Sequence, residues 1–252
     1  MRKGICSLIL AILIAAASPA FAEETKRPEV SGSASVDIMS QYIWRGWQLS
    51  DESVSQPSVG ITYEGIGANI WSNYDNDTTA ITETDYTLNY TFSIDKIGID
   101  VGYIFYTFPD SAFDTQEIYA SASYDVILSP SLTVYYDFDE GEGAFIVAAI
   151  GHSFALPMDI SVDVGASVSY NADNLVMGTD SDGNAFSAFY NGELSASASI
   201  PVYKALSITP MVAYSFPLSD DAEDVLEANA LAVTEDEDGD VFYGGVSISL
   251  SF

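Results

Sequence analysis

Acidic residues are the residues of this sequence whose number and spacing best indicate a function, namely the attraction of cations. The chain of 252 residues contains 37 Asp and Glu but only 7 Lys and Arg, so its formal net charge is −30. Some acids recur at alternate positions, as Glu83 and Asp85 do. Carboxylates that share one face attract cations and repel anions. The same charge balance excludes a nucleic-acid binder, because the phosphate backbone requires a basic surface.

The elements that must position these acids are strands. Hydrophobic residues make up 48% of the chain and aromatic residues 13%, which excludes a disordered acidic tail. From 160 to 171 apolar residues alternate with small or polar ones, and the run 85–94 repeats this pattern, which is the signature of strands. Twelve such runs occur, at 33–45, 56–64, 66–75, 83–94, 97–108, 115–125, 131–139, 144–154, 159–171, 187–200, 205–216 and 241–252.

The connections between these runs alternate in length. Short turns such as Glu64-Gly65 and Asp95-Lys96 follow the even-numbered runs, and most of the connections after the odd-numbered runs are longer and polar. An even number of strands with short turns on one rim and longer loops on the other is typical of bacterial outer-membrane barrels. The sequence therefore predicts an all-β fold: a transmembrane, antiparallel, up-and-down β-barrel of twelve strands, with short periplasmic turns and longer extracellular loops.

Aromatic residues near the strand ends favour this barrel over a soluble β-sandwich. A sandwich would turn its apolar face inward, whereas two aromatic girdles around an apolar band suit contact with outer-membrane lipid and its headgroups. The girdle predicted at the long-loop rim comprises Tyr42, Trp44, Tyr74, Tyr86, Phe138, Tyr170, Tyr190, Phe216 and Phe242. The girdle predicted at the other rim comprises Tyr63, Phe92, Tyr124, Phe154 and Phe252.

The N-terminal segment has the pattern of a secretory signal peptide. Arg2 and Lys3 precede an apolar run over 5–17, and Ala20-Phe21-Ala22 forms a small-residue cleavage site. We expect cleavage after Ala22, which would also remove Cys6, the one cysteine of the chain. The expected division is a cleaved signal peptide over 1–22, a short periplasmic segment over 23–32 and an outer-membrane barrel over 33–252.

The C-terminal run resembles the signal by which the bacterial barrel assembly machinery recognises its clients. Apolar or glycine residues occupy every second position, and the run ends on an aromatic residue. The residues that carry this expected signal are Phe242, Val246, Ile248, Leu250 and Phe252.

The segment 40–46, which reads SQYIWRG, resembles the opening motif of the TorF-type porin family of exported bacterial proteins. The resemblance implies a porin-like role in the outer membrane of a Gram-negative bacterium and brings no catalytic residues. Similar stretches are Gln56-Pro57-Ser58, Trp71-Ser72-Asn73, Glu83 and Asp85 before Tyr86, Tyr106-Thr107-Phe108-Pro109, and Glu117-Ile118-Tyr119.

The polar face of the predicted strands would line the lumen of the barrel. Arg45 is its one clear cation, and it would either set the field across the pore or form a structural ion pair with Glu83 or Asp85. The acids would either select cations or keep the lumen solvated. The predicted pore-lining residues are Asp37, Arg45, Trp71, Glu83, Asp85, Asp100, Glu117, Asp137, Asp139, Asp163 and Glu193.

The loops carry two further features. The stretches 180–184 and 235–240 hold closely spaced acids beside a glycine, so they would be solvated turns or weak sites for divalent cations. A short helix is expected from Asp221 to Ala232, with Leu226 and Leu231 as its apolar anchors.

Three functions fit such a barrel. The first is a porin-like channel for passive diffusion of small, preferably cationic, solutes, either narrow or occluded by an inward-folding loop. The second is a non-conducting barrel that acts as a structural anchor, or as a receptor or adhesin through its acidic extracellular loops. The third is an outer-membrane enzyme, which we do not expect: His152, the one histidine, falls at the periplasmic end of its strand, and the sequence has no cofactor or metal-ligand motif.

Overall fold

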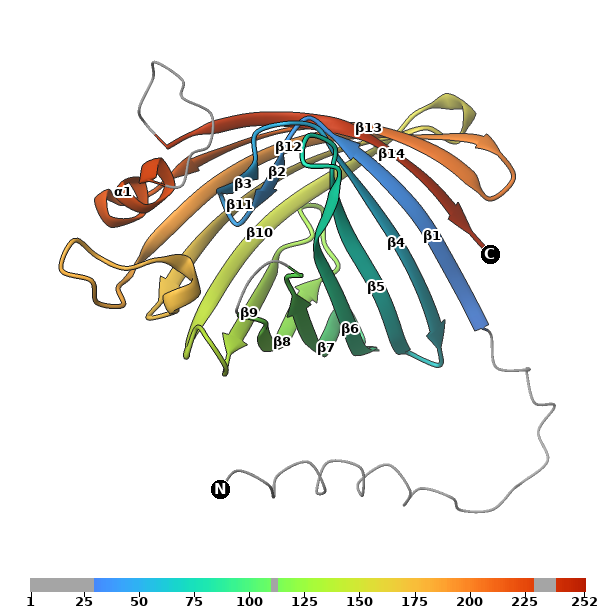
Figure 1. Cartoon of the computed structure of the whole chain (residues 1–252). Coiled ribbons are helices and arrows are strands. Elements are labelled where there is room, and N and C mark those ends of the chain that lie inside the picture. Colours follow the sequence, from blue (N-terminus) through green and yellow to red (C-terminus); the bar gives the residue numbers. More distant parts are fainter. Residues whose placement is uncertain (1–29, 110–112, 229–238) are drawn as a thin grey trace, which may run out of the picture.

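The computed structural model describes residues 30–109, 113–228 and 239–252. Within these residues, twelve strands form one closed antiparallel barrel, which confirms the predicted fold (Figure 1). Strands adjacent in the ring are consecutive in the chain, and β1 pairs with β14 to close it. The barrel strands are β1 (Val30–Met39), β4 (Val54–Tyr63), β5 (Ile66–Asp75), β6 (Ala80–Ile94), β7 (Ile97–Thr107), β8 (Thr115–Tyr124), β9 (Ser131–Asp137), β10 (Gly143–Ala155), β11 (Ser161–Ala172), β12 (Ser187–Tyr203), β13 (Leu206–Pro217) and β14 (Val241–Ser251).

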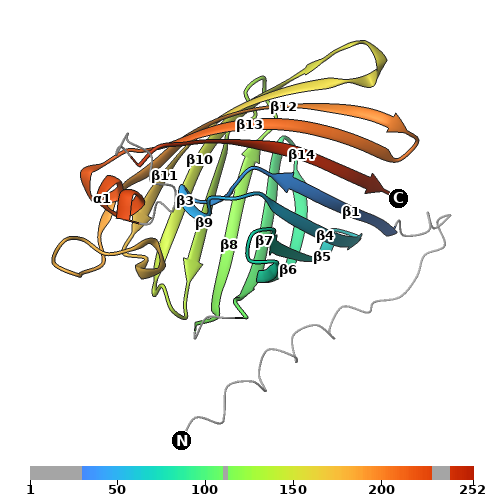
Figure 2. The ribbon, with the colours of Figure 1, turned by 45° about the horizontal axis from the view of Figure 1, so that its top comes forward.

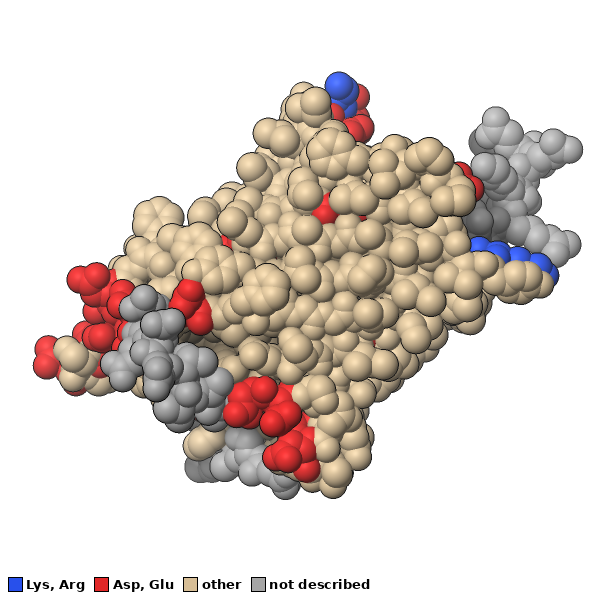
Figure 3. All heavy atoms as spheres, turned by 90° about the horizontal axis from the view of Figure 1, so that it is seen from above, with Lys and Arg blue, Asp and Glu red and all other residues tan. Residues whose placement is uncertain are grey.

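Side chains alternate between the two faces of each strand. Along β4, Val59 and Ile61 are 53% and 55% exposed, whereas Gln56 on the opposite face is 8% exposed. Apolar residues thus face outward and polar residues face the lumen, as in a barrel surrounded by lipid. In the view of Figure 3 most of the wall carries no charge, and the acids gather mainly at the end where α1 and the long loops lie.

The two rims differ as predicted. At the short-turn rim, Glu64 and Gly65 have φ values of 48° and 86° and form a two-residue turn of the kind that suits the twist of a hairpin. The long-loop rim carries the longer connections, among them the 3-10 turn η3 (Leu175–Met177) and the helix α1 (Asp220–Ala228). The other 3-10 turn, η2 (Pro157–Asp159), lies at the short-turn rim. Within the described residues, no helix is long and apolar enough to cross a membrane.

Helix α1 matches the predicted helix in position. Its residues Ala222, Val225 and Leu226 are buried, so Leu226 is an apolar anchor as expected. The second expected anchor, Leu231, lies outside the described residues.

The first predicted strand is wrong in its second half. The run 33–45 was expected to form one strand, but β1 ends at Met39. The chain then forms a separate hairpin of β2 (Tyr42–Trp44) and β3 (Trp47–Ser50). Tyr42 is consequently 7% exposed instead of belonging to the outer girdle. Trp44 and Tyr190, which were also assigned to that girdle, pack in the interior as well.

The ring closes beside the last residue. Gly32 and Phe252 exchange two backbone hydrogen bonds, of 2.6 and 2.9 Å. A Cβ atom at residue 32 would lie 2.5 Å from the Phe252 ring, so only glycine lets this ring lie across β1. The side chains of Phe242, Val246, Ile248, Leu250 and Phe252, which carry the expected assembly signal, are all at least 36% exposed.

If β1 pairs with β14 to close the barrel, two cysteines introduced at paired positions of these strands should form a disulfide. Because Gly32 and Phe252 form a hydrogen-bonded pair, Ser35 and Ser249 form a non-hydrogen-bonded pair, whose Cα atoms approach more closely. In a chain that starts at residue 23, and so lacks the one cysteine, Ser35→Cys/Ser249→Cys should oxidise to a disulfide. Thiol titration of the refolded protein before and after reduction measures this.

The matched control is Ser35→Cys/Ser207→Cys. Ser207 pairs with Ser249 from β13, so it lies one strand further round the ring from Ser35 and out of disulfide reach. Equal oxidation of both variants would contradict the closed ring.

Candidate functional site: a hairpin across the lumen

The hairpin Tyr42–Ser50, called the lumen hairpin from here on, turns at Arg45 and Gly46. Trp44 pairs with Trp47 across the turn. The φ values of Arg45 and Gly46 are 53° and 90°, and a type I′ turn requires positive φ at both of its central residues. This turn therefore presents Arg45 at the tip of the hairpin.

The lumen hairpin crosses the barrel. It leaves the wall between β1 and β4, and the opposite side of the ring is the pair β9 and β10, six strands away in either direction. The Arg45 guanidinium lies over Tyr135 of β9 and Phe145 of β10. Figures 1 and 2 show the hairpin within the ring of strands, near α1.

An ion pair fixes the hairpin tip. Arg45 Nη1 and Nη2 donate to Glu117 Oε1 and Oε2 at 2.8 and 2.7 Å, and the two side chains are 9% and 1% exposed. The guanidinium lies 4.7 Å from the ring centroid of Tyr135, 4.6 Å from that of Phe145 and 4.5 Å from that of Trp44. We call Glu117, Tyr135 and Phe145 the guanidinium cage. Trp44 of the hairpin covers a further side.

The charge of Arg45 is secure in this setting. Burial by itself lowers the pKa of Arg45, but the charge and hydrogen bonds of Glu117, together with the nearby Tyr106 and Tyr135, outweigh burial, and the pKa lies above its ordinary value. The Tyr106 hydroxyl also donates to Glu117 Oε2, at 2.8 Å. Both oxygens of the buried carboxylate are thus satisfied, as a buried ion pair requires.

The base of the hairpin is fixed to β5 and β6. The Tyr42 hydroxyl donates to Glu83 Oε2 at 2.8 Å, and its ring centroid lies 5.6 Å from that of Trp71. Burial, together with the Glu83 and Asp85 carboxylates, raises the pKa of Tyr42 well above its ordinary value, so its hydroxyl stays a donor. Met39 and Val54 complete the apolar cluster around Tyr42.

The other edge of the hairpin meets the loops. Trp47 Nε1 donates to the Tyr190 hydroxyl, which donates to the Met177 carbonyl at 2.9 Å. A Cβ atom at Gly46 would lie 3.4 Å from Leu226 of α1. Hairpin, η3 and α1 thus share one apolar cluster at the long-loop end of the lumen.

Several predicted pore-lining acids face the lumen beside this hairpin. Glu83 is 3% exposed and bound by Tyr42, and Asp85 follows it on the same face. One side-chain oxygen of Asp85 and one of Asp37 are buried without a hydrogen-bond partner in the described structure. These carboxyl groups lie near the hairpin and form no ion pair with Arg45, whose partner is Glu117.

Further predicted acids line other parts of the wall. Asp100 accepts hydrogen bonds from Asn89 and Tyr119, at 2.8 and 2.9 Å. Glu193 accepts one from Tyr243 at 2.8 Å, and Asp163 one from Ser161 at 3.2 Å.

Three expectations need correction. Arg45 pairs with Glu117 rather than with Glu83 or Asp85, because the hairpin carries it across the lumen. Asp139 lies beyond the end of β9, where alternation stops, and it binds Gln116 at 2.8 Å on the outer side of β8. Asp137 is fully buried and accepts the backbone N–H groups of residues 139 and 141, so it holds the turn after β9.

Sequence reasoning missed the aromatic half of the site. Tyr106, Tyr135 and Phe145 all lie on strand positions that the alternation assigns to the polar face. Large aromatic residues on the polar face near the long-loop rim were the available signal.

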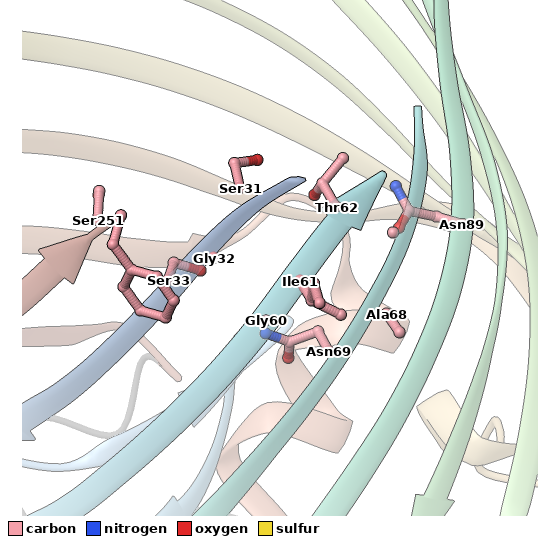
Figure 4. A pocket seen from close by; sticks show the side chains of 12 residues that line it. Ser31, Gly32, Ser33, Gly60, Ile61, Thr62, Ala68, Asn69, Asn89 and Ser251 are labelled. Atoms are coloured by element: carbon pink, nitrogen blue, oxygen red, sulfur yellow. The ribbon is translucent and has the colours of Figure 1, made fainter. Parts of the chain in front are cut away.

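The opposite half of the lumen is lined by small polar residues. At the short-turn rim a cavity of about 340 Å³ opens among β1, β4, β5 and β6, and Figure 4 shows its lining. Its lining residues include Ser31, Ser33, Gly60, Thr62, Asn69 and Asn89. The lumen therefore changes from open and hydroxyl-rich at one end to aromatic at the other.

The acidic loop at 180–184 is a turn. Asp180 Oδ1 accepts the backbone N–H groups of Asp182 and Asn184, at 3.0 and 2.8 Å. Most of the second stretch, 235–240, lies outside the described residues. Among the residues that the structure does describe, no three His, Cys, Asp or Glu side chains are grouped to hold a metal ion.

The fold is that of the twelve-stranded β-barrels found among outer-membrane porins. No family model and no curated protein matches the chain, so the resemblance to the TorF-type family is not confirmed. Solved structures do match. The KdgM porin is 12% identical with a TM-score of 0.56, over 87% of this chain and 99% of that one.

Two further structures share the architecture. The NanC porin is 12% identical with a TM-score of 0.51, over 87% of this chain and 98% of that one. An outer membrane channel from Pseudomonas putida F1 is 11% identical with a TM-score of 0.51, over 94% of this chain and all of that one. Identities this low establish the fold alone.

Breaking the ion pair should loosen the hairpin. Removing one partner of a buried pair costs about 3–5 kcal/mol, so Glu117→Gln should release Arg45 from the wall. All 3 tryptophans of the chain lie in or against the hairpin, at Trp44, Trp47 and Trp71. The variant should therefore show red-shifted tryptophan emission and stronger acrylamide quenching than the parent protein.

Asp163→Asn is the matched control for this measurement. It also neutralises one lumen carboxylate, but its partner Ser161 lies at the short-turn end of β11. Unchanged emission in Glu117→Gln, or an equal change in Asp163→Asn, would show that the ion pair does not hold the hairpin.

Proposed function

We propose that this protein is a porin-like channel of the bacterial outer membrane, through which small solutes diffuse passively. The observation that carries the proposal is the lumen hairpin, which narrows the barrel by binding the wall opposite its root. A loop folded into the bore of a barrel restricts the size of solutes and sets the field that they meet.

The charge around the hairpin supports a preference for cations. Arg45 is paired with Glu117, while Asp37, Glu83 and Asp85 place three further carboxyl groups in the same part of the lumen. One structure of the KdgM porin contains oligogalacturonate, a polyanion. An acidic lumen repels such a molecule, so the solutes of this protein are neutral or cationic.

The apolar outer wall supports a position in the outer membrane, with the short-turn rim periplasmic and the long-loop rim extracellular. Export by the signal peptide cleaved after Ala22 and insertion by the barrel assembly machinery through the C-terminal run belong to the same proposal. The contacts of His152 support no enzymatic role, because its Nδ1 lies 2.7 Å from the Ile127 carbonyl and its ring packs on Phe154.

A non-conducting anchor or receptor is the second candidate. It is favoured by the apolar cluster that joins the hairpin to Met177 and Leu226 at the long-loop end. In that case the acidic loops would be the working surface.

Conductance distinguishes the two candidates. Refolded protein in a planar bilayer with a salt gradient should give stable steps and a reversal potential of the sign expected for cation selectivity. Glu83→Gln/Asp85→Asn should move the reversal potential toward zero, because it removes two carboxylates beside the hairpin.

The control is Asp180→Asn/Asp182→Asn, which removes two charges from the 180–184 turn. A correctly inserted protein without conductance would overturn the channel. An equal loss of selectivity in both variants would show that the site beside the hairpin does not select cations.

A further inference from the structure

The residues of the guanidinium cage all belong to the wall of the barrel. Glu117, Tyr135 and Phe145 lie on three adjacent strands, β8, β9 and β10. Tyr106 of β7 orients the Glu117 carboxylate, and Tyr190 of β12 packs edge-on against Phe145 at 5.6 Å.

The shape of the cage matches one chemical group. The carboxylate accepts two parallel hydrogen bonds, which only a planar fork of N–H donors can supply. The rings of Tyr135 and Phe145 face the same cation at 4.7 and 4.6 Å, and aromatic faces attract cations. An ammonium group could pair with the negative charge of the carboxylate, but it could not donate two parallel hydrogen bonds to its two oxygens.

We propose that the guanidinium cage is a binding site for guanidinium-bearing solutes, and that Arg45 occupies it in this structure as an internal competitor. The proposal rests on the proposed channel for the route by which the solute arrives. It names the class of cation that the lumen holds: small molecules that end in a guanidinium group.

Competition within one chain would make the binding of a free solute weaker and readily reversible. Arg45 is tethered to the wall, so it competes at a high effective concentration and weakens the apparent affinity for a free solute. A solute that takes its place frees the hairpin tip, so the ligand itself would widen the passage.

Arg45→Asn is the variant that empties the cage with least harm to the turn. Asn-Gly is the preferred pair for a type I′ turn, so the backbone at residues 45 and 46 should be kept. Agmatine is the probe. Titrated into refolded protein in micelles and followed by tryptophan emission and calorimetry, it should bind Arg45→Asn at least about tenfold more tightly than the parent protein.

Two further variants test the site itself. Adding Glu117→Gln to Arg45→Asn should weaken agmatine binding at least about tenfold, because it removes the carboxylate of the fork. Adding Asp163→Asn instead removes a lumen charge outside the cage and should leave binding unchanged. Arg45→Gly also permits the positive φ and should behave as Arg45→Asn does.

Binding of agmatine to Arg45→Asn that is absent, or that is indifferent to Glu117→Gln, would overturn the proposal. So would equal binding of putrescine, which carries ammonium groups without the fork, or of urea, which is planar but uncharged. These titrations need no ion flow. A silent barrel that binds agmatine would therefore refute the channel and keep the site, and a conducting barrel that ignores agmatine would do the reverse.

Discussion

The buried pair of Arg45 and Glu117 is the interaction on which the interior of this barrel depends. Neither charge would be tolerated alone at 9% and 1% exposure, so each requires the other. The pair joins residues that are 72 positions apart in the chain. It ties the tip of the hairpin to the wall opposite the hairpin's root, so the hairpin spans the lumen. Tyr42 and Trp47 fix the two edges of the lumen hairpin through hydrogen bonds to Glu83 and Tyr190.

The barrel was predictable because a wall that faces lipid requires a regular alternation of apolar and polar residues in the sequence. One face of each strand must be apolar and the other polar, so a period of two recurs along the twelve strands, although a register shift interrupts it in β12 between Phe189 and Gly192. Loop lengths then separated the two rims. The short-turn girdle, with Tyr63 and Phe154 among its members, was visible for the same reason: both side chains are exposed.

The lumen hairpin was not predictable from that alternation. Tyr42 and Trp44 continue the alternation of β1, so the pattern extended the strand to Arg45. The signal for a turn was the Arg-Gly pair between two tryptophans. The partner of Arg45 could not be read at all, because pairing across a lumen leaves no periodicity in sequence. The prediction that Asp139 lines the pore was wrong for a related reason: β9, and with it the alternation of faces, ends at Asp137.

The contrast between the two ends of the lumen has an electrical consequence. One end is lined mainly by small polar residues such as Ser33 and Asn69, and the other is narrowed by the aromatic residues that pack on the hairpin. When a tapered conduit carries fixed charge on its wall, mobile ions accumulate near the narrow part under one polarity of voltage and are depleted under the other. The proposed channel would then act as a rectifier, because its current would depend on the direction in which the ions are driven.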